Sequence, residues 1–191
     1  GLFTFRGALL KMGIVGLLEY VLLTDVQLDA VDMDYGNKNF RMEGLEIHNP
    51  DGYEMPTAIS VGSIVVDVDP ESLDDEITHI NLIELNKLLV TIEQGKEKKN
   101  ISQLSENAAR LNEEETTGGD SSGSIGISQE EQADSNVHID VIRITGIEVQ
   151  IAAPFLELPI RFPLPDINME NLGGEEGTSV SVAIEETLNR L

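Results

Sequence analysis

The stretch TDVQLDAVDMDYGNKNFRMEGLEIH, residues 24–48, decides the fold. Its apolar residues alternate with polar ones, which is typical of half-buried β-strands. The alternation slips by one position in each half, at Ala30 and at Gly44. The stretch therefore predicts a hairpin with a turn at Gly36-Asn37 and facing bulges at the slips. A slip moves the apolar side chains to the other face of a strand, so we expect long strands that curve around a core or a groove.

Strand signals continue along the chain. They predict a strand at 59–69 with a slip at Gly62, a strand at 77–92 with a break at Asn86-Lys87, and strands on both sides of Gly146. The prolines between residues 158 and 166 predict an edge strand or an extended segment over the sheet. The first strands follow one another through short turns, which favours antiparallel pairing. The expected fold class is α+β: a curved, mainly antiparallel β-sheet with N-terminal and C-terminal helices.

Three helices are expected, at 8–22, in NISQLSENAARL at 100–111, and at 178–191. Asn100 is the expected cap of the second helix, and Ser179 or Ser181 that of the third. The apolar face of the first helix comprises Leu10, Ile14, Leu17, Leu18 and Val21, and that of the third comprises Val182, Ile184, Leu188 and Leu191.

The domain organisation follows from these patterns. Residues 1–23 are an amphipathic or anchor-proximal helix, and residues 24–191 are a single β-rich domain. Residues 113–135 are rich in Gly, Ser and Glu, so we expect a mobile acidic insertion there.

The N-terminal segment carries the one contact site that we predict. Arg6, Lys11 and Glu19 interrupt its apolar run, which leaves no uncharged stretch long enough to span a membrane. The segment can pack on its own sheet, or it can lie at a membrane surface or against a partner. We expect Leu17 and Val21 to pack inward and the earlier residues to face lipid or a partner. The candidate membrane or partner contacts are Leu2, Phe3, Phe5, Leu9, Leu10 and Ile14.

The composition limits the possible partners. The 191 residues include 35 acidic and 12 basic ones, for a net charge of -23. Such a surface repels nucleic acid and anionic headgroups, so we expect no nucleic-acid partner. There is no cysteine and no tryptophan. Thiolate chemistry is excluded, and the core must be built largely from Ile, Leu and Val.

No catalytic motif is present, and we expect no enzyme, no catalytic residue, no metal and no cofactor. The histidines, His48, His79 and His138, lie in or at the ends of expected strands without a nucleophile or ligand motif around them. Asp32 and Glu43 occupy the first and twelfth positions of an EF-hand-like loop. Its invariant glycine is replaced by asparagine and no helices flank it, so a hairpin accounts better for these residues.

Four segments together resemble the AsmA-like family of small membrane-anchored envelope proteins. The resemblance covers about residues 24–93 and 137–191, and its motifs are structural turns. The segments are GLEIHNPDGYEMPTAISVGSIVVDVDPESL at 44–73, NISQL at 100–104, HIDVIRITGIEVQI at 138–151 and LPIRFPLPDINMENLG at 158–173.

The resemblance implies an N-terminal anchor and a β-rich domain on the periplasmic face of a bacterial membrane. Larger AsmA-like proteins are thought to carry phospholipid along β-sheet grooves. At about 3.4 Å per residue, the strands expected here are too short to bridge two membranes.

Three functional readings follow. The first is a lipid-binding or outer-membrane maintenance protein, with phospholipid as its ligand. The second is an accessory subunit that docks on a larger membrane complex. A water-stress-type domain of the late-embryogenesis class shares the Asn-Pro turn but explains fewer motifs. A groove between sheet and helices favours the first reading, and a closed core favours the second.

Overall fold

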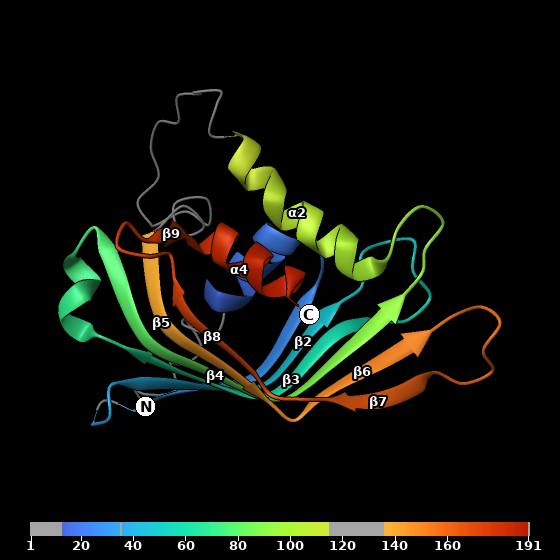
Figure 1. Cartoon of the computed structure of the whole chain (residues 1–191), viewed down its shortest axis with the longest axis horizontal. Helices are drawn as coiled ribbons and strands as arrows, with labels where there is room; N and C mark the ends of the chain where they lie inside the picture. Colours follow the sequence, from blue (N-terminus) through green and yellow to red (C-terminus); the bar gives the residue numbers. More distant parts are fainter. Residues whose placement is uncertain (1–12, 35, 115–135, 191) are drawn as a thin grey trace.

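A computed structural model describes residues 13–34, 36–114 and 136–190. Over these residues nine strands form one open, mostly antiparallel sheet, and three helices lie in its concave side (Figure 1). The expected α+β class, with a curved sheet and helices at both ends, is confirmed. The expected mobile insertion falls on residues 115–135, which lie outside the described residues, while residues 113 and 114 end a helix.

The strands run in the order β1-β2-β3-β4-β5-β8; off this path, β6 pairs with the end of β4, β7 pairs with β6, and β9 pairs with β5. The first four pair antiparallel, as expected, whereas β4 pairs in parallel with β5 and β6, which was not predicted. The bounds are β1 Val26–Asp34, β2 Asn39–His48, β3 Thr57–Val68, β4 Ile77–Glu93, β5 Asn136–Thr145, β6 Ile147–Ala152, β7 Ile160–Leu164, β8 Ile167–Leu172 and β9 Thr178–Ser179.

A row of residues that the strand registers skip, here called the first crease, runs across the sheet. Pairing between β1 and β2 skips one position but keeps its register, since Leu28 faces Leu45 and Ala30 faces Glu43. The same skip recurs between β2 and β3 and between β3 and β4, and the row then passes through the connections from β5 to β6 and from β7 to β8. The first crease comprises Asp29, Gly44, Gly62, Lys87, Gly146 and Pro165. The predicted bulges in the first hairpin are therefore wrong: the interruptions on the two strands match, and no residue is inserted.

The slips keep the apolar side chains on one face of the sheet, whereas the sequence predicted that they would move them to the other face. Apolar residues three positions apart flank the crease on each strand, for example Leu28 and Val31 on β1, or Val61 and Ile64 on β3. Both members of each pair belong to one core. The expectation that they move to opposite faces is wrong. Residues such as Gly44, with φ +65°, are left-handed and reset the alternation, so the sheet bends while its apolar face stays concave.

A second, shorter crease crosses β4, β5 and β8 at Asn81, Asp140 and Asn171. Asn171 has φ +56°, a conformation that asparagine tolerates better than most residues. Ile139 and Ile142 flank it on β5 and are both buried. The two creases fold the sheet into a trough, with β5 and β6 on opposite walls (Figure 1).

The helices fill this trough. The N-terminal helix, described over residues 13–22, buries Val21 and Leu22, and Leu17 packs against the same core, as expected. α2 (Asn100–Glu114) buries Leu104, Ala108 and Leu111 along one face. α4 (Val180–Asn189) begins at Ser179, whose hydroxyl accepts from Val182 N, so the expected cap is confirmed.

The buried face of α4 differs in part from the expectation. Ala183, Ser181 and Leu188 are buried, while Val182 is only half-buried. Asn100, which was expected to cap α2, has a different role. Its side-chain oxygen accepts from Glu93 N at 2.9 Å, and its amide donates to Thr91 O and to Asn49 Oδ1. Asn100 therefore ties the start of α2 to β4 and to the Asn-Pro turn.

Candidate functional site

An apolar cavity of about 250 Å³ lies between the sheet and α4. Apart from Thr187, every residue that lines it is apolar, and most of them are buried. Half-buried Ile80, Ile83 and Ile184 mark the side on which the cavity meets the surface. The lining comprises Leu45, Ile47, Ile59, Val61, Ile80, Ile83, Leu85, Leu88, Val137, Ile139, Ile142, Ile144, Val180, Ala183, Ile184, Thr187 and Leu188.

The two creases create this cavity. They keep residues from three segments of β4 on one concave face, represented by Ile80, Ile83 and Leu88. A straight strand would turn the middle segment away, because side chains alternate between faces. The cavity floor is thus a direct consequence of the apolar spacing of three.

α4 roofs the cavity and is held at both ends. At its start, the loop before the helix is fixed to β5, where His138 contacts the carbonyl oxygen of Gly174 through Nδ1 and Asp140 Oδ1 through Nε2 at 2.8 Å. At its end, Asn189 accepts from Ser105 of α2 at 2.7 Å. His138 therefore has a structural position at the second crease, where the His79 ring lies 5.4 Å from its own.

The predicted contact residues lie almost entirely outside the described residues. This applies to Leu2, Phe3, Phe5, Leu9 and Leu10. Ile14 is described: it is half-buried and packs against the core, so the structure places it with the inward-facing residues of the helix. The carbonyl end of this helix is satisfied by α2, because Arg110 donates to Val21 O and Asn107 donates to Leu22 O.

The sequence analysis missed an exposed apolar patch at the end of the β6–β7 hairpin. Phe155 and Leu158 in the connecting loop are largely exposed, and Ile160 and Phe162 on β7 are also exposed. The prolines of this segment correctly predicted an edge, since among the described strands β7 pairs with β6 alone. The sequence carries one signal for this patch, which is the density of large apolar residues between those prolines. A core at the edge of a sheet does not require so many of them.

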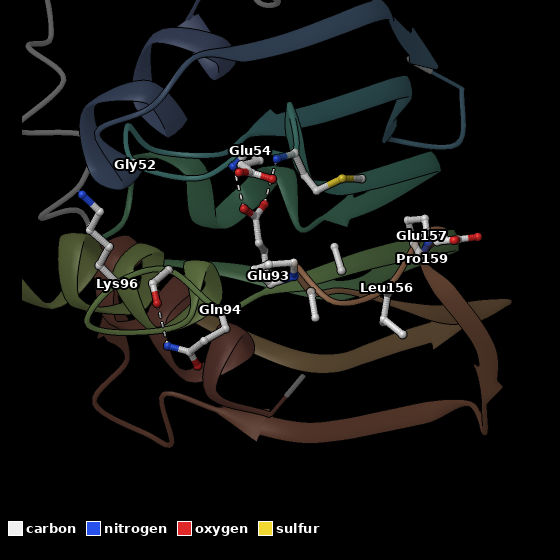
Figure 2. A pocket seen from close by; sticks show the side chains of 13 residues that line it. Gly52, Glu54, Glu93, Gln94, Lys96, Leu156, Glu157 and Pro159 are labelled. Atoms are coloured by element: carbon white, nitrogen blue, oxygen red, sulfur yellow. Dashed lines mark hydrogen bonds between the residues drawn. The ribbon is translucent and has the colours of Figure 1, made fainter.

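A second cavity, of about 440 Å³, lies between the loop of this hairpin, the end of β4 and the turn after β2 (Figure 2). Its most buried carboxylate, Glu93, accepts from Glu54 N at 2.6 Å and from Met55 N at 2.8 Å. Both oxygens of Glu93 are thus used to hold the turn after β2. The remaining polar side chains among the described lining residues are Glu54, Gln94, Lys96 and Glu157, and none of these residues is a histidine.

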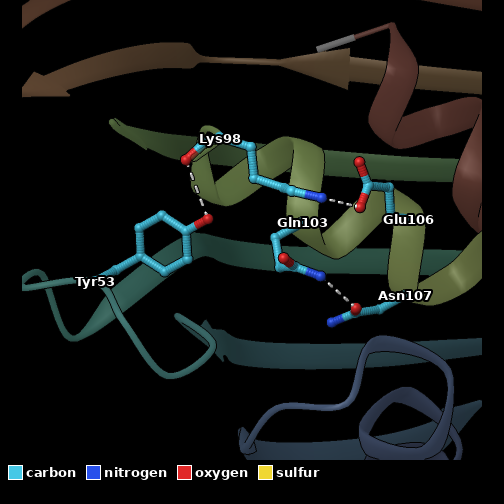
Figure 3. Close-up of polar contacts among 5 residues, drawn as sticks. All are labelled: Tyr53, Lys98, Gln103, Glu106 and Asn107. Atoms are coloured by element: carbon cyan, nitrogen blue, oxygen red, sulfur yellow. Dashed lines mark hydrogen bonds and ion pairs between the residues drawn. The ribbon is translucent and has the colours of Figure 1, made fainter. Parts of the chain in front are cut away.

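The same turn is anchored a second time on α2. The Tyr53 hydroxyl donates to Lys98 O at 3.2 Å, and the Lys98 ammonium pairs with Glu106 (Figure 3). Burial raises the pKa of Tyr53, and the hydrogen bond from Lys98 to Glu106 raises the pKa of Lys98. Tyr53, Lys98 and Glu106 hold the rim of the second cavity in place, and their polar groups are engaged in contacts with one another.

The acidic loop considered for calcium is explained by the hairpin. Asp34 accepts from Gly36 N at 2.9 Å and from Asn37 Nδ2 at 2.7 Å. The side-chain hydrogen bond from Asn37 is the main cause that lowers the pKa of Asp34. Within the described ranges, no group of three or more His, Asp or Glu side chains is placed to hold a metal ion.

Within residues 13–34, 36–114 and 136–190, no helix has both the length and the apolar character needed to cross a bilayer.

The fold and the cavity define a class of protein: an α+β domain whose creased sheet forms a trough with an apolar cavity beneath its C-terminal helix. Comparison of the chain with models of known protein families, and with characterised proteins, gives no match. The AsmA-like resemblance therefore stays a prediction.

Proposed function

We propose that this protein is a non-enzymatic, membrane-tethered envelope protein that holds a hydrocarbon chain of a lipid in the cavity beneath α4. The observation that carries the proposal is the cavity lining, which is apolar on the sheet side and on the helix side. A dry cavity of this kind favours an apolar guest over water: an engineered apolar cavity of about 150 Å³ stays dry and binds benzene.

The size of the cavity limits what it holds. Pockets for drug-sized ligands are usually about 300–1,000 Å³, and this cavity is about 250 Å³. It therefore suits one hydrocarbon chain, or part of one, and not a whole phospholipid. Since Thr187 is the one polar residue among the described residues of the lining, the headgroup of the lipid stays outside.

The proposed location is the periplasmic face of a bacterial membrane, with the N-terminal segment as the tether. The AsmA-like resemblance of residues 44–73 and 138–173 supports this location. Leu2, Phe3, Phe5, Leu9 and Leu10 remain the proposed contacts within the segment. Deletion of residues 1–8 should release the protein from its membrane without unfolding it, because the inward-facing residues of the helix, Leu17 and Val21, are retained.

A second candidate function is an accessory subunit of a membrane complex. The exposed apolar end of the β6–β7 hairpin favours it, since a patch of this kind on a monomer marks an interaction surface. Under this reading the space beneath α4 would remain empty.

Native mass spectrometry of the protein purified from its own membranes separates the two functions. The proposed function predicts a bound species with the mass of a single lipid. A protein without lipid but with a stoichiometric protein partner would support the accessory subunit instead. Neither species would refute both proposals.

A further inference from the structure

Of the seven exposed large apolar side chains among the described residues, five belong to the β6–β7 hairpin. Phe155 is 85% exposed, Leu158 79% and Ile160 53%. In Figure 1 the hairpin projects beyond the helices that cover the rest of the trough. Large apolar side chains gathered at a protruding tip are costly in water, and such a patch marks a contact site.

The exposed patch continues the apolar floor of the trough. Ile151 pairs with Ile160, and Val149 pairs with Phe162. Cross-strand partners share a face, and alternate residues on a strand share it too. Ile151, Ile160 and Phe162 therefore lie on the same face as buried Ile147, beyond the reach of the helices.

The backbone of the tip has few N–H groups, which suits it to an apolar environment. Residues 154–165 contain Pro154, Pro159, Pro163 and Pro165, which are four of the seven prolines in the chain. Proline has no N–H group, and an unsatisfied N–H group costs several kcal/mol in hydrocarbon. The Leu156 N–H donates to Ala153 O at 2.9 Å. The same prolines make β7 a poor partner for an added strand of another protein.

The charge of the tip is balanced, although the chain as a whole is not. Residues 151–165 include one acidic residue, Glu157, and one basic residue, Arg161, within a chain of net charge -23. Arg161 already donates to Gln150 Oε1 at 2.6 Å. Residues 151–165 therefore lack the basic cluster that anionic headgroups attract, and they lack the excess of acidic residues that the chain has as a whole.

We propose that the tip of the β6–β7 hairpin, with Phe155 and Leu158 at its centre, inserts into the interfacial region of a lipid bilayer with neutral, zwitterionic headgroups. This contact is separate from the N-terminal tether. The inference rests on the proposed membrane-associated function but not on the ligand of the cavity.

The chain offers a direct reporter, because it contains no tryptophan. In the full chain, Phe155→Trp places a single tryptophan at the tip, and Leu73→Trp places one at another exposed leucine, 57% exposed, as the matched control. On addition of phosphatidylcholine vesicles, the Phe155→Trp emission should shift to the blue and be quenched by brominated acyl chains. The Leu73→Trp emission should not change.

A second pair of variants tests whether the tip contributes to binding. Phe155→Ser combined with Leu158→Ser should lower the vesicle partition coefficient at least about tenfold, since burial of even one large apolar side chain contributes that much. Leu73→Ser should leave it unchanged. Mixing anionic lipid into the vesicles should weaken binding of the unaltered chain, because of its negative charge.

The outcomes that overturn the inference are distinct. They are an unshifted Phe155→Trp emission on vesicles, equal shifts at the tip and at the control, and a shift seen only with a bound protein partner. Loss of the lipid adduct in native mass spectra would refute the cavity proposal without affecting these results.

Discussion

Gly44 on β2 faces Asp29 on β1 so closely that a methyl group on Gly44 would lie 2.0 Å from Oδ2 of Asp29. Gly44 also has φ +65°, a conformation that residues with a side chain rarely adopt. The two residues form the first step of the crease that folds the sheet. The trough, and with it the cavity, depends on residues in the first crease that adopt a left-handed backbone conformation, as Gly44 does.

Gly44→Ala should lower the free energy of unfolding by about 2–4 kcal/mol, from backbone strain and from the clash with Asp29. In an Asp29→Gly background the same change should cost only about 1–2 kcal/mol, because the strain remains while the clash, which includes Asp29 Cβ at 2.9 Å, is removed. Urea unfolding of the four proteins gives the coupling. Equal costs in both backgrounds would show that Asp29 plays no part.

Lys87 holds the same crease on β4 at φ +59°. Lys87→Gly should leave the stability unchanged or raise it by up to about 1 kcal/mol, because glycine adopts this conformation without strain. Lys87→Val should lower the stability by at least about 1 kcal/mol, since β-branched residues tolerate it poorly. Thermal unfolding compares the two variants, and a valine variant as stable as the glycine variant would contradict the account.

Asp34 should titrate below its ordinary value of 3.8, because Asn37 and two backbone amides hold its carboxylate. A lowered pKa in the folded state means that the contribution of Asp34 to stability is present above the unfolded pKa and is lost as pH falls through the folded pKa. NMR titration of the Asp34 carboxyl carbon checks this. Asn37→Ala should move the pKa upward, and an unmoved value would refute the assigned cause.

Asn100 is fully buried and joins three backbone or side-chain groups from two other segments. Asn100→Ala should lower the free energy of unfolding by about 2–4 kcal/mol, since it leaves buried polar groups unpaired. Asn100→Asp should not restore the loss, because it keeps the acceptor for Glu93 N and removes both donors. Ser102→Ala, at an exposed position on α2, is the control and should be neutral. A rescue by aspartate would contradict the assignment of the donors.

The sequence predicted the strands well because their alternation is strong. It located the slips at Gly44 and Gly62 correctly, and the slip predicted at Ala30 falls one residue earlier, at Asp29. Their consequence was predicted wrongly. A slip on one strand looks the same whether a residue is inserted or whether the neighbouring strands skip the same row. Only the pairing shows that the interruptions match across the sheet.

The candidate site was less predictable. The parallel pair of β4 and β5 joins segments that are far apart in the chain, and local patterns carry no signal for it. On α4, Ala183 lines the cavity while Val182 does not, because the rotation of the helix is fixed by Ser179, His138 and the contacts with α2. The exposure of Phe155 likewise depends on how far the helices reach along the trough, which the sequence does not give.

The central claim is that the cavity beneath α4 holds one hydrocarbon chain, and titration with a fluorescent fatty acid tests it most directly. Ala183→Leu fills the cavity from the helix, and Glu186→Leu adds the same side chain to an exposed position of the same helix as the control. The account predicts saturable binding at one site in the unaltered protein and in Glu186→Leu, with at least about tenfold weaker binding in a folded Ala183→Leu. Absence of binding, or equal affinity in all three proteins, would contradict it.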